Sequence, residues 1–203
     1  IEEHPFSYAS SAEHPERLIF GIKELGDFTS TVGGISPGAK AYVDGPYGTF
    51  DLERHSEKRH VFIAGGIGSA PIMSMLRTLA DRDDERQLQF FYGSRSWEEV
   101  IFREELEALQ ERLNLEIIHV LENPPEDWEG EQGYITKDVL ERYLPSPAYE
   151  CVYFICGPLP MINLVESSLE ELSVSHKDMH EISRDHAFEL TREKIYSESY
   201  KMA

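Results

Sequence analysis

The chain has 203 residues, of which 28% are charged, and its 38 acidic against 19 basic side chains give a formal net charge of −19. A charge of that sign repels a phosphate backbone, which excludes nucleic acid as a partner. The two cysteines, Cys151 and Cys156, are too few for a disulfide framework and indicate a reducing compartment, and no apolar run approaches the ~20 residues that span a bilayer.

Short apolar runs divided by turns fill the first quarter of the chain, at residues 6–9, 18–22 and 39–43. Runs of this length and spacing are typical of antiparallel β strands. Three strands are too few for an independent barrel, so we expect residues 1–55 to be part of a larger antiparallel β-barrel. The chain begins at Ile1 without an initiating Met, and we expect it to be a fragment of a larger protein.

From about residue 58, strand-like apolar runs alternate with segments of helical periodicity. Strands are expected at residues 61–64, 88–92, 115–121, 152–156 and 195–200, and helices around residues 72–79, 102–113, 139–144 and 162–172. A polar, Pro-containing loop is expected at residues 122–131. Repeated β-then-α units predict parallel strands joined by right-handed crossovers, and therefore an α/β fold with a doubly wound parallel sheet over residues 56–203.

The first of these strands ends in a glycine-rich turn, Gly-Gly-Ile-Gly-Ser-Ala-Pro at residues 65–71. Glycines at such a turn let the backbone approach a pyrophosphate, whose charge is met by the unpaired N–H groups of the following helix. Gly65, Gly66 and Gly68 are the candidates for this contact, and Pro71 fits the first helical turn, where its missing N–H costs nothing. A turn that is glycine-rich for packing alone is the alternative.

The second strand ends at Ser94 and Arg95, which would face the same crevice, because ligands of such sheets bind beyond the carboxyl ends of the strands. NAD-binding units often place an acidic residue here for the ribose 2′-hydroxyl, whereas a hydroxyl and a guanidinium suit a 2′-phosphate. We therefore expect NADPH, with NADH as the alternative. An ion pair of Arg95 with Glu98 or Glu99 is the purely structural interpretation.

Taken in order, five motifs resemble the ferredoxin-NADP reductase superfamily of flavoprotein reductases. They are His-Pro-Phe-Ser at 4–7, Asp-Gly-Pro-Tyr-Gly at 44–48, the glycine turn at 65–71, Tyr-Gly-Ser-Arg at 92–95 and Cys-Gly-Pro-Leu-Pro-Met at 156–161. His-Pro-Phe-Ser is most similar to the ferric reductase and NADPH oxidase branch, where many other members carry Arg-x-Tyr-Ser. The resemblance implies part of an FAD-binding barrel at residues 1–55 and a Rossmann-like NAD(P)-binding domain at residues 56–203.

On the flavin side, the resemblance places Phe6 against the isoalloxazine ring and Ser7 near the N5 atom that accepts hydride. It also implies a phosphate contact near His4 and Pro5, and a short helix start against the FAD pyrophosphate at Lys23, Gly26 and Thr29. The alternatives are an inward-facing strand residue for Phe6, an ordinary loop residue for His4, and a hydroxyl-capped turn without ligand around Thr29.

On the nicotinamide side, Cys156-Gly157-Pro158 resembles the family's Cys-Gly-Pro, whose thiol lies near the nicotinamide C4 atom. The resemblance thus implies catalytic roles for Ser7 and Cys156, although a buried structural Cys is the alternative for the latter. Relatives often end with an aromatic near the flavin, which makes Tyr200 a candidate even though three residues follow it. No metal site is expected.

These observations predict the dehydrogenase region of an FAD-dependent NADPH oxidoreductase. Hydride would pass from NADPH to FAD, and single electrons would pass on to a heme-bearing transmembrane domain of the same parent chain or to a separate one-electron carrier. The parent would then be an integral membrane protein with this soluble region on the cytoplasmic side. A soluble ferredoxin or oxygenase reductase is the alternative, and a non-catalytic NADPH-binding sensor module is the second.

Overall fold

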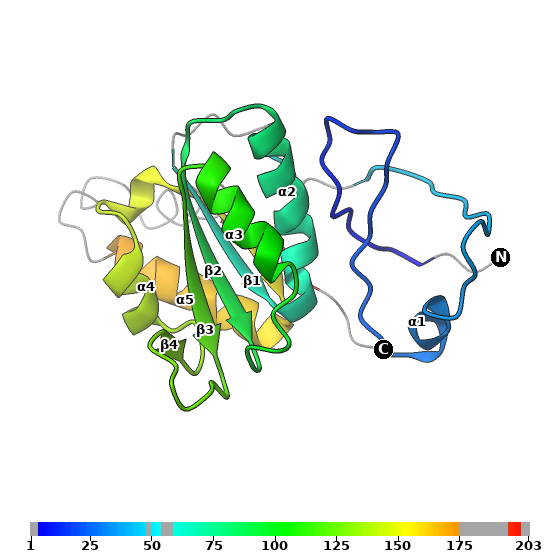
Figure 1. Ribbon diagram of the computed structural model, residues 1–203. Coiled ribbons are helices and arrows are strands. Elements are labelled where there is room, and N and C mark those ends of the chain that lie inside the picture. Colours follow the sequence, from blue (N-terminus) through cyan, green and yellow to red (C-terminus); the bar gives the residue numbers. More distant parts are fainter. Residues whose placement is uncertain (1–3, 48–49, 54–58, 175–194, 200–203) are drawn as a thin grey trace.

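A six-stranded parallel sheet forms the centre of the computed structural model, which describes residues 4–47, 50–53, 59–174 and 195–199 (Figure 1). Its spatial order is β4-β3-β2-β1-β5-β6, and every neighbouring pair is parallel. The strands are β1 (Arg59–Gly65), β2 (Gln87–Ser94), β3 (Leu115–Leu121), β4 (Glu131–Gln132), β5 (Val152–Gly157) and β6 (Ile195–Ser199). The predicted α/β fold with a doubly wound parallel sheet is confirmed.

Helices lie on both faces of this sheet. One face is covered by α2 (Ser69–Asp81), which follows the short helix η1 (Gly66–Gly68), and by α3 (Arg103–Arg112). The other face is covered by α4 (Lys137–Tyr143) and α5 (Leu159–Val174), with the one-turn helix η2 (Ala148–Glu150) before β5. These helices confirm the four predicted from periodicity.

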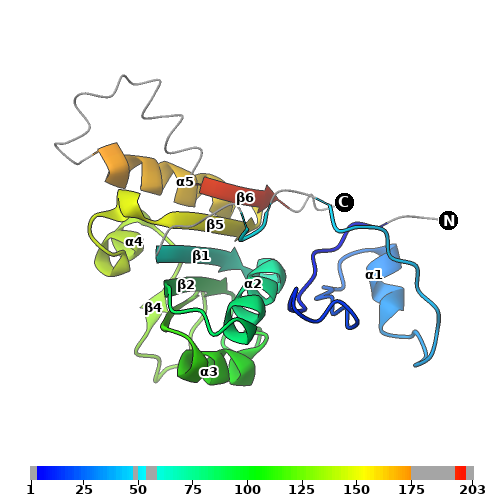
Figure 2. The ribbon, with the colours of Figure 1, turned by 90° about the horizontal axis from the view of Figure 1, so that it is seen from above.

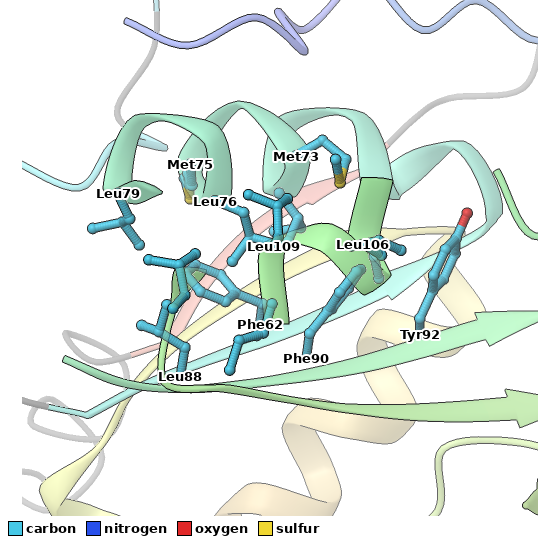
Figure 3. Close-up of a cluster of buried hydrophobic side chains, with 14 of the residues drawn as sticks. Phe62, Met73, Met75, Leu76, Leu79, Leu88, Phe90, Tyr92, Leu106 and Leu109 are labelled. Carbon is cyan, nitrogen blue, oxygen red and sulfur yellow. The ribbon is translucent and has the colours of Figure 1, made fainter. Parts of the chain in front are cut away.

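Alternating strand side chains build the two halves of the core. Phe62 of β1 and Phe90 of β2 are paired in register, fully buried, and point toward α2 and α3 (Figure 3). Their neighbours Ile63 and Phe91 are also paired and buried, but they belong to the cluster beneath α4 and α5. Strands buried on both faces read as continuous apolar runs, which is why this sheet was visible in the sequence.

The strand order reverses at β1. The chain passes from β1 to β2 on one side and returns to β5 on the other, so the carboxyl ends of β1 and β5 lie side by side, with Ala64 opposite Cys156. In both views these strand ends point toward residues 4–47, which we call the N-terminal segment (Figures 1 and 2). The fold therefore brings the glycine turn and the Cys-Gly-Pro motif to one edge of the sheet.

The N-terminal segment contains far less sheet than expected. Of the three expected strands, the structure shows a single antiparallel bridge between Tyr8 and Phe20, beside a 2.7 Å hydrogen bond from the Ala9 amide to the Ile19 carbonyl. Residues 39–43 pair with no described strand. Extended runs need further strands to satisfy their backbone groups, and too few are available among the described residues.

Two smaller differences concern short elements. The strand β4 begins at Glu131, inside the stretch expected to be a loop, because two residues are too few to show any periodicity. The helix α1 (Asp27–Val32) forms in the N-terminal segment, where the family resemblance implied a short helix start. Among the described residues, no helix is both long enough and apolar enough to cross a membrane.

Candidate functional site

Two glycines of the turn are required by close packing against the end of β5. A Cβ atom on Gly68 would lie 2.1 Å from the carbonyl oxygen of Cys156, and one on Gly65 would lie 2.7 Å from the sulfur of Met161. Such distances are far below van der Waals contact. Gly65 and Gly68 therefore serve, at least in part, the packing role that was the alternative to a ligand contact.

Gly66 differs from its neighbours. Its φ of +53° lies in the left-handed region, and a Cβ atom there would meet nothing within 4 Å. Packing therefore leaves the space beside this residue open, at the point where β1 passes into η1 and α2. This is the one glycine of the turn that a ligand could approach without displacing protein atoms, and it lies close to the N-terminus of a 13-residue helix.

Buried hydroxyl groups hold the start of α2 against β2. The Tyr92 hydroxyl donates a 3.1 Å hydrogen bond to Ser69 Oγ and accepts one of 3.3 Å from the Ile101 amide. Burial raises the pKa of Tyr92, so the phenol stays protonated as the donor. The Ser94 side chain is only 6% exposed and its hydroxyl oxygen is buried. In this arrangement the Ser94 hydroxyl does not reach the edge of the sheet.

Arg95, by contrast, is exposed at the carboxyl end of β2. The backbone there is fixed, because the Arg95 carbonyl accepts a 2.8 Å hydrogen bond from the Asn123 amide. The predicted alternative, an ion pair with Glu98 or Glu99, does not form, and within the described part of the chain the guanidinium has no other ion pair. Ser96 instead hydrogen-bonds Glu98 and lowers the pKa of that carboxyl. Arg95 thus remains available to an anion.

The Cys-Gly-Pro motif lies at the end of β5, next to the glycine turn. Cys156 is fully buried, and a Cβ on Gly157 would lie 2.7 Å from the Met161 methyl and 3.0 Å from the Gly65 nitrogen. The two strand ends are therefore in direct backbone contact, with Pro158 and Met161 packed over them. Sequence reasoning gave Met161 only a general packing role. Its position over two glycines could be inferred only from the fold.

The flavin-side candidates form a small aromatic stack in the N-terminal segment. The His4 ring lies over the Phe28 ring with centroids 3.6 Å apart and an interplanar angle of 8°, and the Phe6 ring lies 6.2 Å from Phe28. His4 and Pro5 are exposed, while Phe6 and Ser7 are half-buried. Phe28 was not expected from the sequence, because nothing in the spacing linked it to the His-Pro-Phe-Ser motif.

The other flavin-side candidates lie around the start of α1. Thr29 Oγ1 accepts hydrogen bonds from the Leu25 and Gly26 amides, at 2.9 and 3.0 Å. This is the hydroxyl-capped turn that stood as the structural alternative for Gly26 and Thr29. Lys23 is exposed nearby in the sequence. Tyr200 lies outside the described residues, as do Gly48 and residues 175–194.

An aromatic cluster beside the second and third strand ends encloses His119. The imidazole lies edge-on to Trp97 at 5.1 Å and tilted against Tyr92 at 5.8 Å, and Trp128 lies 5.2 Å from Trp97. Burial lowers the pKa of His119 to about 4. The imidazole is therefore neutral at physiological pH, and the cluster carries no charge from this residue.

This burial predicts a pH dependence of stability. The unfolded chain protonates His119 near pH 6.5, but the folded chain does so only near pH 4, so the free energy of unfolding should fall across this window as pH falls. Relative to His119→Gln, the native chain should lose about 3 kcal/mol at most. Urea unfolding at pH 4 to 7 measures it. His14→Gln, at an exposed histidine, is the control, and parallel curves for native chain and His119→Gln would contradict the prediction.

The opposite edge of the sheet holds a separate cavity of about 230 Å³. Its lining comes from the amino ends of β1, β2 and β3, including Arg59, Gln87, Gln89 and Glu116. None of the predicted site residues lines it. The described residues also contain no group of three His, Cys, Asp or Glu side chains placed to hold a metal ion.

Comparison with known proteins gives a consistent family match. A family model described as the oxidoreductase NAD-binding domain matches residues 62–167. NADH-cytochrome b5 reductase 1 of Pyricularia oryzae is 30% identical over 169 residues, covering 80% of this chain and 55% of that protein. One component of the Na(+)-translocating NADH-quinone reductase of Marinomonas sp. is 38% identical over 162 residues, covering 76% and 39%. The chain thus spans about half the length of these relatives.

Solved structures with a similar fold include a ferredoxin NADP+ reductase from Neisseria gonorrhoeae with bound FAD and NADP. It superposes with a TM-score of 0.69 at 19% identity, covering 96% of this chain and 78% of that one. The likeness extends through the N-terminal segment as well as the sheet.

Proposed function

The chain belongs to the oxidoreductase NAD-binding domain family, within the ferredoxin-NADP reductase superfamily, and on that premise we propose that it is the nucleotide-binding part of a flavin-dependent NAD(P)H oxidoreductase. The observation that carries the proposal is the open approach to the Gly66 backbone, at the edge where the strand order reverses. Ligands of doubly wound sheets bind at such switch points.

The residues at this edge fit a dinucleotide. The N-terminus of α2, reached through Gly66, would meet the pyrophosphate with backbone N–H groups. Gly65 and Gly68 let η1 lie close against β5, which keeps that backbone in place. Cys156, Gly157 and Pro158 would border the nicotinamide end, and Pro71 lies in the first turn of α2.

The flavin would bind the N-terminal segment. When bound, the two cofactors supply the redox chemistry, hydride transfer from the reduced nicotinamide to FAD. The half-exposed stack of His4, Phe6 and Phe28 offers aromatic surface to a planar ring, and Ser7 offers a hydroxyl next to it in the sequence. Lys23, Gly26 and Thr29 are the proposed contacts to its phosphates. We propose residues 1–55 as part of the flavin domain and 56–203 as the nucleotide domain.

For the hydride donor we propose NADPH. The exposed Arg95 guanidinium, which is free of ion pairs with described residues, is suited to a 2′-phosphate. NADH is the second candidate, and it is favoured by the names of the relatives, an NADH-cytochrome b5 reductase and a component of an NADH-quinone reductase. Nucleotide titration separates the two.

For the acceptor we propose a heme or another one-electron carrier. Support comes from the relatives' names, which include cytochrome b5 and quinone reductases, and from a flavohemoglobin with a TM-score of 0.67. A membrane-embedded parent chain of the ferric reductase or NADPH oxidase type rests on the His-Pro-Phe-Ser motif alone. A soluble ferredoxin or oxygenase reductase is the alternative.

Anaerobic reduction of the flavin tests the proposal. The parent protein loaded with FAD is mixed with NADPH or NADH, and the flavin absorbance is followed with time. The proposal predicts bleaching by at least one nucleotide. A protein that binds nucleotide but leaves the flavin oxidised would instead be a sensor module, and the oxidoreductase proposal would be wrong.

A further inference from the structure

The outer face of α2 holds the N-terminal segment through backbone contacts. The Ser74 hydroxyl donates a 2.6 Å hydrogen bond to the Ser10 carbonyl, and Thr78 Oγ1 accepts one of 2.9 Å from the Ala12 amide. Ala9 is fully buried at this contact. The segment that follows the His-Pro-Phe-Ser motif is therefore fixed to the helix that begins at the glycine turn.

Arg77 joins three parts of the chain at this interface. Its guanidinium donates two 2.6 Å hydrogen bonds to the Glu105 carboxylate of α3 and a third to the Ala9 carbonyl of the N-terminal segment. The same group lies 5.2 Å from the centre of the Phe102 ring. With a side chain only 14% exposed, this ion pair is far less screened by water than a surface pair.

Phe102 gives the contact added significance. It is the N-cap of α3 and has a φ of +62°, a conformation that an aromatic residue rarely adopts. It also closes the loop that starts at Arg95, whose Ile101 amide is bonded to Tyr92. Arg77 thus touches both the segment proposed to hold the flavin and the end of the loop proposed to hold the nucleotide.

Resting on the proposed function, we infer that Arg77 is a positioning residue that sets the distance and angle between the flavin segment and the nicotinamide edge. It acts through the Ala9 carbonyl, which lies two residues from Ser7. Two residues of extended chain span about 7 Å at most, so a displacement of Ala9 is passed on to Ser7 with little slack.

The helix α2 serves as the rigid connection to the nucleotide side. Arg77 lies eight residues after Ser69, or about 12 Å along the helix axis. A second contact stands near the helix start, where a Cβ on Gly21 would lie 3.0 Å from Ala70 Cβ and 3.1 Å from Ile67 Cδ1. Contacts at both ends of one helix fix an angle, which a single contact would not.

Lysine cannot reproduce this geometry. The planar guanidinium satisfies a bidentate carboxylate, a carbonyl and an aromatic face at once, whereas an ammonium has neither the fork nor the flat surface. Arg77→Lys should therefore be intermediate between the native chain and Arg77→Met. The matched control is Arg112→Met, because Arg112 bonds the Ala80 carbonyl and Asp81 but no residue of the N-terminal segment.

The first readout is hydrogen exchange of this chain without flavin. Arg77→Met should speed exchange of the Ala9 and Ala12 amides at least tenfold while the amides of β1 keep their protection. Arg112→Met should leave Ala9 and Ala12 unchanged. Unchanged exchange of these two amides in Arg77→Met would overturn the inference, and if that variant loses protection throughout, Arg77→Lys provides the same comparison.

The second readout is flavin reduction in the FAD-loaded parent. Arg77→Met should lower the rate at saturating nucleotide tenfold to a hundredfold with the KM for nucleotide changed less than twofold, because the nucleotide contacts are intact while alignment is lost. A rise in KM at unchanged rate would overturn the inference. Absence of flavin reduction in the native protein would instead contradict the proposed function, and the exchange experiment would still test the docking of the segment.

Discussion

Gly68→Ala should lower the free energy of unfolding by about 3 kcal/mol, the upper end of the usual cost of overpacking. The new methyl carbon would lie 2.1 Å from the Cys156 carbonyl oxygen and 2.6 Å from its carbonyl carbon. Both are backbone atoms of the central strand β5, so neither can rotate away as a side chain would. Relief requires that η1 move off the sheet, which separates the glycine turn from the Cys-Gly-Pro motif.

Gly66→Ala is the matched comparison, two residues away. Nothing lies within 4 Å of its new methyl group, and the cost is that of a left-handed conformation, about 1 kcal/mol. We expect this variant to stay folded and yet lose nucleotide affinity, because the methyl group occupies the only open approach in the turn. Urea unfolding of both variants decides the matter. A Gly68→Ala chain within 1 kcal/mol of the native one would show that the close contact with β5 is wrong.

Arg95→Ala should weaken NADPH binding by roughly tenfold to a hundredfold, which corresponds to the 1.5 to 3 kcal/mol of hydrogen bonds to a charged group. NADH affinity should change less than twofold, because NADH lacks the 2′-phosphate. Isothermal titration of native chain and variant with both nucleotides measures the four affinities. The effect should shrink as salt is added, since Arg95 is exposed.

The control for this prediction is Arg112→Ala, which removes the same charge at the far end of α3. With a net charge of −19, loss of any arginine weakens anion binding slightly, and this variant measures that general effect. Equal losses in the two variants would mean that Arg95 makes no specific contact. Native affinity for NADH above that for NADPH would decide for the donor named in the relatives.

The central sheet was predictable from the sequence because its strands are buried on both faces. The run at residues 115–121 was predicted with the ends that β3 has, and the i, i+3, i+4 and i+7 spacing located α2. The glycine turn could be placed at the switch point for the same reason. The division of labour among its glycines could not, because it depends on contacts with β5, about 90 residues away.

The N-terminal segment was less predictable. Apolar runs there suggested strands, but strand formation depends on partners that the local sequence does not specify. Ser94 was expected to face a ligand, and the structure buries it beside Tyr92, because inward and outward directions at a strand end follow from register. Arg77 gave no signal at all. Its partners Ala9 and Glu105 lie 68 and 28 residues away.

The account rests on the claim that the edge at Gly66 binds a nicotinamide dinucleotide. Calorimetric titration of this chain with NADPH and with NADH, repeated on Gly66→Ala, tests it most directly. The account predicts one site per chain for at least one nucleotide and loss of that binding in the variant, whose unfolding free energy stays within about 1 kcal/mol of the native value. Binding of neither nucleotide by the native chain, or equal binding by the folded variant, would contradict it.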